Sequence, residues 1–232
     1  MAVTLQTART AIRERLNEAA EGQWTNTVLN RWINEARRVI AREAETYELE
    51  ATLAITAAVQ DKAAPTDLFR VHRAAFHPTG SSAVYKLEPR TLHALDAIGM
   101  TQLHISTQYP QFFALMLRPA MTIRMYPTPS VAGNLKLIYY AVPADESTDG
   151  NPLSDLPEGW HDLIYDYAEW KAFRRAGRMQ LAAEARDQFQ QNLQDMIGLT
   201  RIAHDQPLDI VTAQGGRGWA GVYGDYDESW GW

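Results

Sequence analysis

The hydrophobic positions near the start of the chain recur with a helical period. A first apolar stripe, which repeats every three or four residues and predicts a helix ending at Gly22, consists of Leu5, Ala8, Ile12, Leu16 and Ala19. A second helix is predicted after Thr25, whose hydroxyl is suited to cap it, with Trp24 and Leu29 placed to form a hydrophobic staple. Its apolar face consists of Leu29, Trp32, Ile33, Ala36, Val39 and Ile40. The short link between the two helices predicts an antiparallel pair.

From residue 47 the period changes from helical to strand-like. Apolar and polar side chains alternate over residues 47–60, which predicts a strand with one buried face. The further strands predicted in the same region are 68–77, 111–117, 121–126 and 134–142. The last two are expected to pair as a hairpin over the Pro- and Gly-rich connection 127–133. The intervening elements are predicted to be a turn at 61–67, a loop at 78–82 and a short helix from Pro89 to Gly99.

Two more helical stripes follow a polar loop at 143–157. Asp155 is expected to cap the first of these helices, with Glu158 three residues later as in a capping box, and Gly177 to end it. The last helix is predicted from Arg178 to Leu199, with a stripe made of Ala182, Ala185, Phe189, Leu193 and Met196. Because Trp32 and Phe189 lie on such stripes, we expect both to be buried in the same core.

This order of elements predicts an α+β fold. The helix pairs at the two ends are expected to form a four-helix bundle, with the β-rich middle inserted between the second and third helices, and an extended C-terminal segment. The predicted divisions are an N-terminal helix pair at 1–45, an inserted β-rich domain with one short helix at 46–143, a C-terminal helix pair at 144–200, and a flexible C-terminal segment at 201–232.

The composition narrows the classes of function. With 22 Lys and Arg against 28 Asp and Glu, the formal net charge is −6. Because phosphate binding depends on Lys and Arg, this charge disfavours binding of nucleic acid over the whole surface of the protein. The chain contains no cysteine, which excludes disulfides, Cys-ligated metals and a thiol nucleophile. The sequence contains no run of about 18 or more apolar residues, so no membrane span is predicted. Residues 1–16 lack the apolar core of a secretory signal, so none is expected.

No pattern in the chain points to a catalytic, metal or cofactor site. The six histidines show no HxH or HExxH spacing, and His72 and His77, five residues apart on a strand, are expected on opposite faces. Asp162 and Asp166 share a helix face but flank no nucleophile, so we interpret them as solvated or subunit-facing. The same interpretation applies to the basic groups Arg31, Arg37, Arg38, Arg42, Arg174, Arg175 and Arg178. We therefore predict that the protein is not an enzyme.

The C-terminal segment (residues 201–232) is rich in aromatic residues and glycine. Residues 215–232 contain six Gly and have no period, so they are not expected to bury their aromatic side chains locally. Large aromatic side chains on such a segment suit docking into pockets of a partner protein. The residues predicted to bind a partner are Arg217, Trp219, Tyr223, Tyr226, Trp230 and Trp232.

Several segments resemble the adaptor proteins, or head-to-tail connector proteins, of tailed bacteriophages. Each segment is short, but together they follow the order seen in that family over residues 4–197, and the C-terminal segment is not matched. The matching segments are the Thr4-Leu5 helix start, Leu29-Asn-Arg-Trp-Ile-Asn-Glu-Ala36, Ala64-Pro-Thr-Asp67-Leu-Phe-Arg70-Val, Tyr109-Pro-Gln-Phe-Phe113, Thr122-Ile-Arg-Met-Tyr-Pro-Thr-Pro129, Leu137-Ile-Tyr-Tyr140 and Leu163-Ile-Tyr-Asp-Tyr-Ala168.

The resemblance implies a structural protein of the virion. Such adaptors form a ring, usually dodecameric, in the neck below the portal, join the portal to the phage tail or nozzle, and continue the DNA ejection channel. The implied partners are the portal protein, a tail or nozzle protein and further copies of the chain, assembled in the host cytoplasm. The acidic balance fits a channel wall past which duplex DNA moves without specific binding. The aromatic residues of the C-terminal segment would dock on the portal or on a neighbouring subunit.

Two other classes of function stay open at this point. One is a virion-associated hydrolase that degrades cell wall, which would need paired acids in a cleft and would be revealed by turnover of peptidoglycan. The other is a carbohydrate- or protein-binding module that uses the β-rich region and its aromatic residues. A monomer that binds glycan and never forms rings would favour the second.

Overall fold

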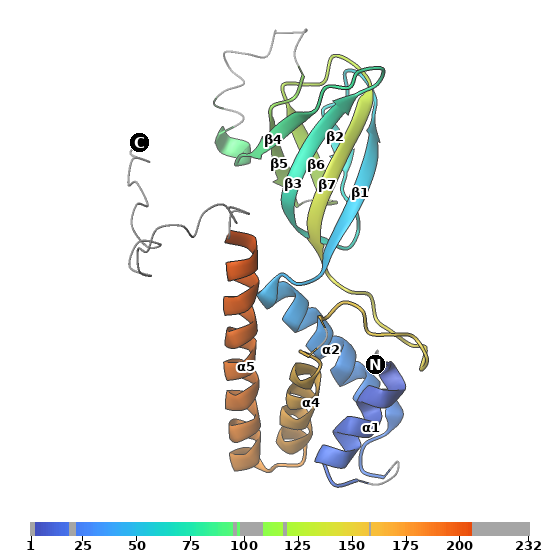
Figure 1. Ribbon diagram of the computed structural model, residues 1–232, viewed down its shortest axis with the longest axis vertical. Coiled ribbons are helices and arrows are strands. Elements are labelled where there is room, and N and C mark those ends of the chain that lie inside the picture. The colour runs from blue at the N-terminus through green and yellow to red at the C-terminus, as the bar shows by residue number, and fades with distance from the viewer. Residues whose placement is uncertain are drawn as a thin grey trace, which may run out of the picture.

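Four named helices and seven strands make up the part of the chain that the computed structural model describes (Figure 1). The described residues are 3–18, 22–94, 97, 109–117, 120–157 and 159–205, and the side chains of 201–205 are excepted. The helices are α1 (Leu5–Arg15), α2 (Asn26–Ala44), α4 (Asp162–Arg175) and α5 (Met179–Asp205). The strands are β1 (Glu48–Ile55), β2 (Asp61–Ala63), β3 (Leu68–Pro78), β4 (Tyr85–Pro89), β5 (Phe112–Met116), β6 (Thr122–Tyr126) and β7 (Gly133–Ala141).

The helices lie together at one end of the molecule (Figure 1). There α4 packs against each of the other three helices and lies between α1 and α5, while α2 also contacts α1 and α5. The apolar stripes meet in one core, in which Trp32 and Phe189 are each 4% exposed. The prediction that these two aromatic side chains are buried together is therefore confirmed.

The predicted N-cap is confirmed for α2 and is wrong for α4. The backbone N–H of Val28 donates to the hydroxyl of Thr25 at 3.4 Å, so Thr25 caps α2 as predicted. Trp24 and Leu29 are both buried in the helical core, as the staple requires. The predicted cap of the third helix is wrong, since α4 begins at Asp162 and the side chain of its N-cap residue, His161, makes no capping hydrogen bond.

The seven strands form one sheet that curls into a nearly closed barrel at the other end of the molecule (Figure 1). The strand order is β1-β7-β3-β4-β5-β6-β2, and every pairing is antiparallel except that of β4 with β5. Residues of β1 alternate between exposed and partly or fully buried, which confirms the period read from the sequence. The buried side chains of the barrel include Phe76, Leu87, Ile123, Met125, Leu135 and Leu137.

The predicted hairpin between the last two strands is wrong. β6 pairs with β5 and β2, whereas β7 pairs with β1 and β3. The connection between them is held by other parts of the barrel: Ala58 donates to the carbonyl of Pro129, and Thr79 donates to that of Ala132. With the connection held in this way, β7 lies between β1 and β3 and not beside β6.

At the start of β7 the chain passes very close to β3. A Cβ atom on Gly133 would lie 2.5 Å from the carbonyl oxygen of His77 and 2.6 Å from the ring of Phe76. Only glycine therefore fits where β7 begins its pairing with the end of β3.

Two strands of the sheet were not predicted, since β2 lies within the expected turn at 61–67 and β4 lies where no strand was expected. β4 lies between β3 and β5, and Pro89, expected to start a short helix, is the last residue of this strand. A strand of five residues that pairs in parallel with a distant segment carries little local signal. Most of the later part of the expected helix lies outside the described residues.

The predicted four-helix bundle with an inserted domain is also wrong. The molecule is a mixed α+β protein in which a seven-stranded, nearly closed sheet is joined to an uneven helical layer. α1 has 11 residues and α5 has 27, so α5 extends past the other helices and its Ile197 and Thr200 reach residues of β3 and β7. The division of the chain at residues 45, 143 and 200 stays a prediction.

We expect the substitution Phe189→Ala to lower the free energy of unfolding by about 3–5 kcal/mol, the cost of removing a buried aromatic side chain. Denaturant unfolding of the purified chain measures this. Leu199→Ala on the same helix is the control, because Leu199 is 57% exposed and its loss should have little effect. An effect of Phe189→Ala below about 1 kcal/mol would contradict the packing of α5.

The edge of the sheet supplies a prediction about pH. Two hydrogen bonds of 2.8 Å from Arg124 to Asp61 join β6 to β2 and hold the pKa of the Asp61 carboxyl below its ordinary value. The stabilisation is therefore present above about pH 4 and is lost as the pH falls through the lowered pKa. We expect Asp61→Asn to be less stable than the wild type at pH 7 by about 1 kcal/mol or less, since the pair is partly exposed. Thermal unfolding at pH 2–7 should show the two proteins converging in acid.

Candidate functional site

The long loop that leads from the sheet back to the helices is fixed by a buried ion pair. Arg37 on α2 donates from Nε to both carboxylate oxygens of Asp155, at 2.9 and 3.0 Å, and its Nη2 lies 2.8 Å from Oδ1. The two side chains are 8% and 2% exposed. Asp155 does not cap α4, which begins at Asp162, and its oxygens instead accept hydrogen bonds from the guanidinium.

Neighbouring polar residues hold the backbone of the same loop. Asn34 donates to the carbonyl of Glu146 at 2.9 Å and accepts from its N–H at 3.0 Å, much as a paired strand would. Arg9 on α1 donates to Asp149 at 2.7 Å, and this hydrogen bond lowers the pKa of the Asp149 carboxyl. The loop is therefore fastened to both α1 and α2.

The interpretation of Arg37 as a solvated or interface residue is wrong. A signal was present in the sequence, because Arg37 follows Ile33 by four residues and precedes Ile40 by three, on the apolar stripe of α2. An arginine on such a stripe needs a buried acceptor, and the sequence alone does not name the partner 118 residues away. Arg38, the next residue, pairs with the exposed Asp145 at the surface.

The carboxylates of Asp162 and Asp166 are engaged in a contact between helices. The guanidinium of Arg15 on α1 binds both of them, and Asn192 on α5 donates to Asp166 at 2.8 Å. Asp166 is 7% exposed, so its interpretation as solvated or subunit-facing is wrong. The pair joins α1, α4 and α5.

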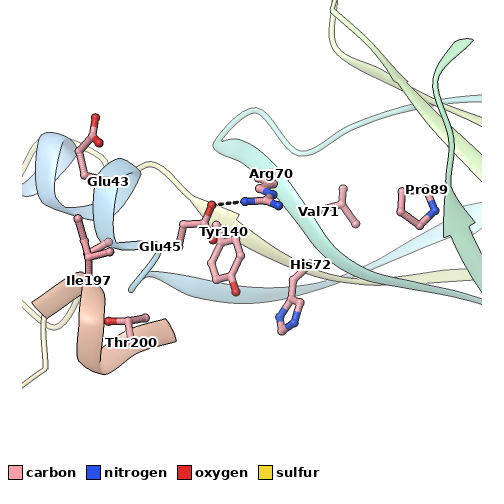
Figure 2. Close-up of a pocket in the computed structure, with 10 residues that line it drawn as sticks. Glu43, Glu45, Arg70, Val71, His72, Pro89, Tyr140, Ile197 and Thr200 are labelled. Atoms are coloured by element: carbon pink, nitrogen blue, oxygen red, sulfur yellow. Dashed lines mark hydrogen bonds and ion pairs between the residues drawn. The ribbon is translucent and has the colours of Figure 1, made fainter. Parts of the chain in front are cut away.

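A hollow of about 400 Å³ lies where the helical layer meets the sheet (Figure 2). Its walls come from the end of α2, from β3 and β7, and from the last turns of α5, and they include Glu43, Glu45, Arg70, His72, Tyr140, Ile197 and Thr200. Arg70 donates to Glu45 at 2.6 Å, which links the sheet to the residue that ends α2. We call this feature the junction hollow.

Stacked rings and paired charges line the junction hollow, where the helical layer meets the sheet. Tyr140 is 4% exposed and stacks on His72 with 5.4 Å between ring centroids. Burial, together with the negative charges of Glu45 and Glu48, raises the pKa of the Tyr140 hydroxyl. That hydroxyl therefore stays neutral at physiological pH, and the acids and bases around it are largely paired. Because Ile197 and Thr200 line the hollow, this part of α5 lies beside the sheet.

The family to which the chain belongs follows from a comparison with known families. The model of the family described as SU10 adaptor protein matches residues 3–211, which covers all the elements described above. The chain belongs to the SU10 adaptor protein family. This is a bacteriophage adaptor family, so the protein is a structural component of the virion, as the resemblance implied. No curated protein matches the chain.

The candidate binding residues of this adaptor lie outside the described part of the chain: Arg217, Trp219, Tyr223, Tyr226, Trp230 and Trp232. Within the described residues no group of three or more His, Asp or Glu side chains is arranged to hold a metal ion. None of the helices examined there has the length and apolar character required to cross a bilayer.

The histidines on β3 differ from the expectation. Irregular pairing with β7 occurs between Val71 and Arg73, which adds a residue to β3 and alters its alternation. His72 stacks on Tyr140, and His77 lies opposite Asn134, so both point to the outer face of the sheet. The prediction that His72 and His77 lie on opposite faces is therefore wrong.

We expect Arg37→Ala to lower the free energy of unfolding by about 3–5 kcal/mol, since it leaves the carboxylate of Asp155 buried without its charge partner. Arg38→Ala is a matched control at the adjacent position, because its partner Asp145 is exposed and the pair contributes about 1 kcal/mol or less. Equal effects of the two substitutions in chemical denaturation would contradict the importance of the buried pair.

Proposed function

We propose that this adaptor assembles into a ring, a dodecamer on the expectation from its family, that joins the portal of a filled capsid to the phage tail or nozzle. The family match over residues 3–211 carries this proposal. The ring would continue the DNA ejection channel at the head–tail interface, after assembly in the host cytoplasm. In this role the protein catalyses no reaction.

The physical properties of the chain support a connecting role. The loop after β7 is fastened to the helical layer by Arg9, Asn34 and Arg37. Arg70 of β3 also pairs with Glu45 at the end of α2, so side-chain contacts as well as the chain itself join the sheet to the helical layer. A stiff subunit suits a ring that transmits force between capsid and phage tail. The net charge of −6 favours a channel wall that repels duplex DNA and lets it pass without specific binding.

The C-terminal segment is proposed to make the contacts between this subunit and its partners. Arg217 and the aromatic residues Trp219, Tyr223, Tyr226, Trp230 and Trp232 would bind the portal or a neighbouring subunit. Glycines between them raise the conformational entropy of the free chain, so ordering it requires the burial of several aromatic side chains. Each fully buried aromatic contributes on the order of 2–3 kcal/mol, enough in sum to offset that cost.

We expect the purified full-length chain to be largely monomeric and to form rings when mixed with the portal protein. Mass measurement in solution and electron micrographs of the mixture test the two halves of this statement. A chain that ends at His204 should keep its helical circular dichroism but dock poorly on the portal. A stable dimer, or rings without affinity for the portal, would count against the proposal.

A second variant separates the loss of aromatic contacts from the loss of chain length. In the full-length chain, the five aromatic residues from Trp219 to Trp232 are replaced by serine, which keeps the length and the charges. Docking by this variant as strong as that of the wild type would remove the C-terminal aromatic residues from the proposal.

A further inference from the structure

Cationic side chains gather on the outer face of the sheet around a small residue of β3. Lys136 on β7 lies opposite Ala75, and Ala75 lies opposite Lys86 on β4. Directly paired residues point to the same face, and adjacent strands are about 4.8 Å apart, so the two lysines lie on either side of Ala75, with about 10 Å between their backbones. Both lysine side chains are exposed.

Two further basic residues lie along β3 itself. Arg73 and His77 are each two residues from Ala75, so they share its face of the sheet. Together with Val84, Ile138 and Lys136 they line a shallow hollow of about 320 Å³ in which Ala75 takes part. We call the surface formed by Arg73, His77, Lys86 and Lys136 the basic sheet face.

The basic sheet face carries more cations than carboxylates among the described residues, which place Glu50 at its β1 edge and Glu88 two residues from Lys86 on β4. Arg73, Lys86 and Lys136 form no ion pair among these described residues, whereas Arg70, Arg90 and Arg124 on the same sheet pair with Glu45, Glu88 and Asp61. Among the residues that line the hollow, Glu50 contributes the carboxylate and lies at the β1 edge. A local excess of positive charge on a chain of net charge −6 favours an acidic partner.

The sequence of this protein contains a segment with the matching chemistry. Residues 225–232 read Asp-Tyr-Asp-Glu-Ser-Trp-Gly-Trp, with three carboxylates in four positions and three aromatic residues. Carboxylates pair with Lys and Arg, and aromatic rings bind both these cations and apolar side chains such as Val84. Acidic residues of the loop after β7 are less available, because Asp145, Asp149 and Asp155 already pair with arginines.

The length of chain allows this segment to reach a neighbour. Asp225 lies twenty positions after Asp205, the end of α5, and an extended chain of that length spans up to about 66–72 Å. A closed ring also needs two different complementary surfaces on each subunit. The basic sheet face and the acidic segment form such a pair.

We propose that the basic sheet face of one subunit binds the acidic, aromatic segment 225–232 of a neighbouring subunit. The inference rests on the proposed ring and names the surface that receives the end of the C-terminal segment. In this arrangement the segment links successive subunits of the ring and leaves the rest of each subunit to face the portal and the phage tail.

Cross-linking in the assembled ring tests the contact. Full-length chain with a photoreactive phenylalanine at Tyr226, half of it labelled with ¹⁵N, is assembled on the portal protein and irradiated. Mass spectrometry should find position 226 of one chain cross-linked to peptides of another chain that contain Ala75, Val84 or Lys136. Cross-links that join a labelled to an unlabelled peptide show that two different chains are in contact. Cross-links only within one chain would overturn the assignment to a neighbour. Cross-links only to the portal would overturn the inference and leave the proposed function standing, and absence of rings would overturn both.

Charge reversal tests the chemistry of the contact. Arg73→Glu, Lys86→Glu and Lys136→Glu together should lower the yield of the cross-link about tenfold, since each exposed ion pair changes an equilibrium constant by up to a few fold. Asp225→Lys, Asp227→Lys and Glu228→Lys in the same chain should restore it. The matched control carries Arg174→Glu, Arg178→Glu and Arg186→Glu, the same change of net charge in the helical layer.

Two results would contradict the inference directly. A cross-link yield unchanged by reversal of the basic sheet face would show that its charges do not hold the segment. The second result concerns binding of duplex DNA. If the wild-type chain retains DNA, and charge reversal abolishes this retention without changing the cross-link yield, the face binds nucleic acid instead.

Discussion

The guanidinium of Arg37 and the carboxylate of Asp155 meet inside the helical layer, across 118 residues of sequence. Burial of two charges is costly, and the cost is offset only where both are hydrogen-bonded in good geometry. Here Nη1 of the guanidinium also donates to Oδ1 of Asn34 and to the carbonyl of Ala144. The pair therefore places the loop that leaves the sheet, and with it the start of α4, relative to α2.

The coupling of sheet and helices depends on this placement. Once the loop is fixed, α4 lies between α1 and α5, where Arg15 joins it to α1 through Asp162 and Asp166. α5 then extends to the junction hollow, where it meets β3 and β7. Such internal ties suit the proposed connecting role, since relative motion of the parts of a connector would loosen the connection.

The distribution of charge separates internal from external roles. Five arginines of α1 and α2 are paired with acids of the same chain: Arg9, Arg13, Arg15, Arg37 and Arg38. On the outer face of the sheet, Arg73, Lys86 and Lys136 form no ion pair within the described part of the chain. Paired charges fix the fold of one subunit, whereas neighbouring cations left without an acid favour contact with another molecule.

Features that depend on local patterns were determined by the sequence alone: the helical stripes, the cap at Thr25 and the alternation in β1. The resemblance of several short segments, in their order along the chain, indicated the phage adaptor family. Contacts between distant segments were decided only by the tertiary structure. Asp155 and Glu158 have the spacing of a capping box, but α4 begins only at Asp162 and Asp155 instead accepts hydrogen bonds from Arg37. Similarly, strand order and the irregularity beside His72 depend on register across the sheet, which no local pattern records. The cations around Ala75 come together for the same reason.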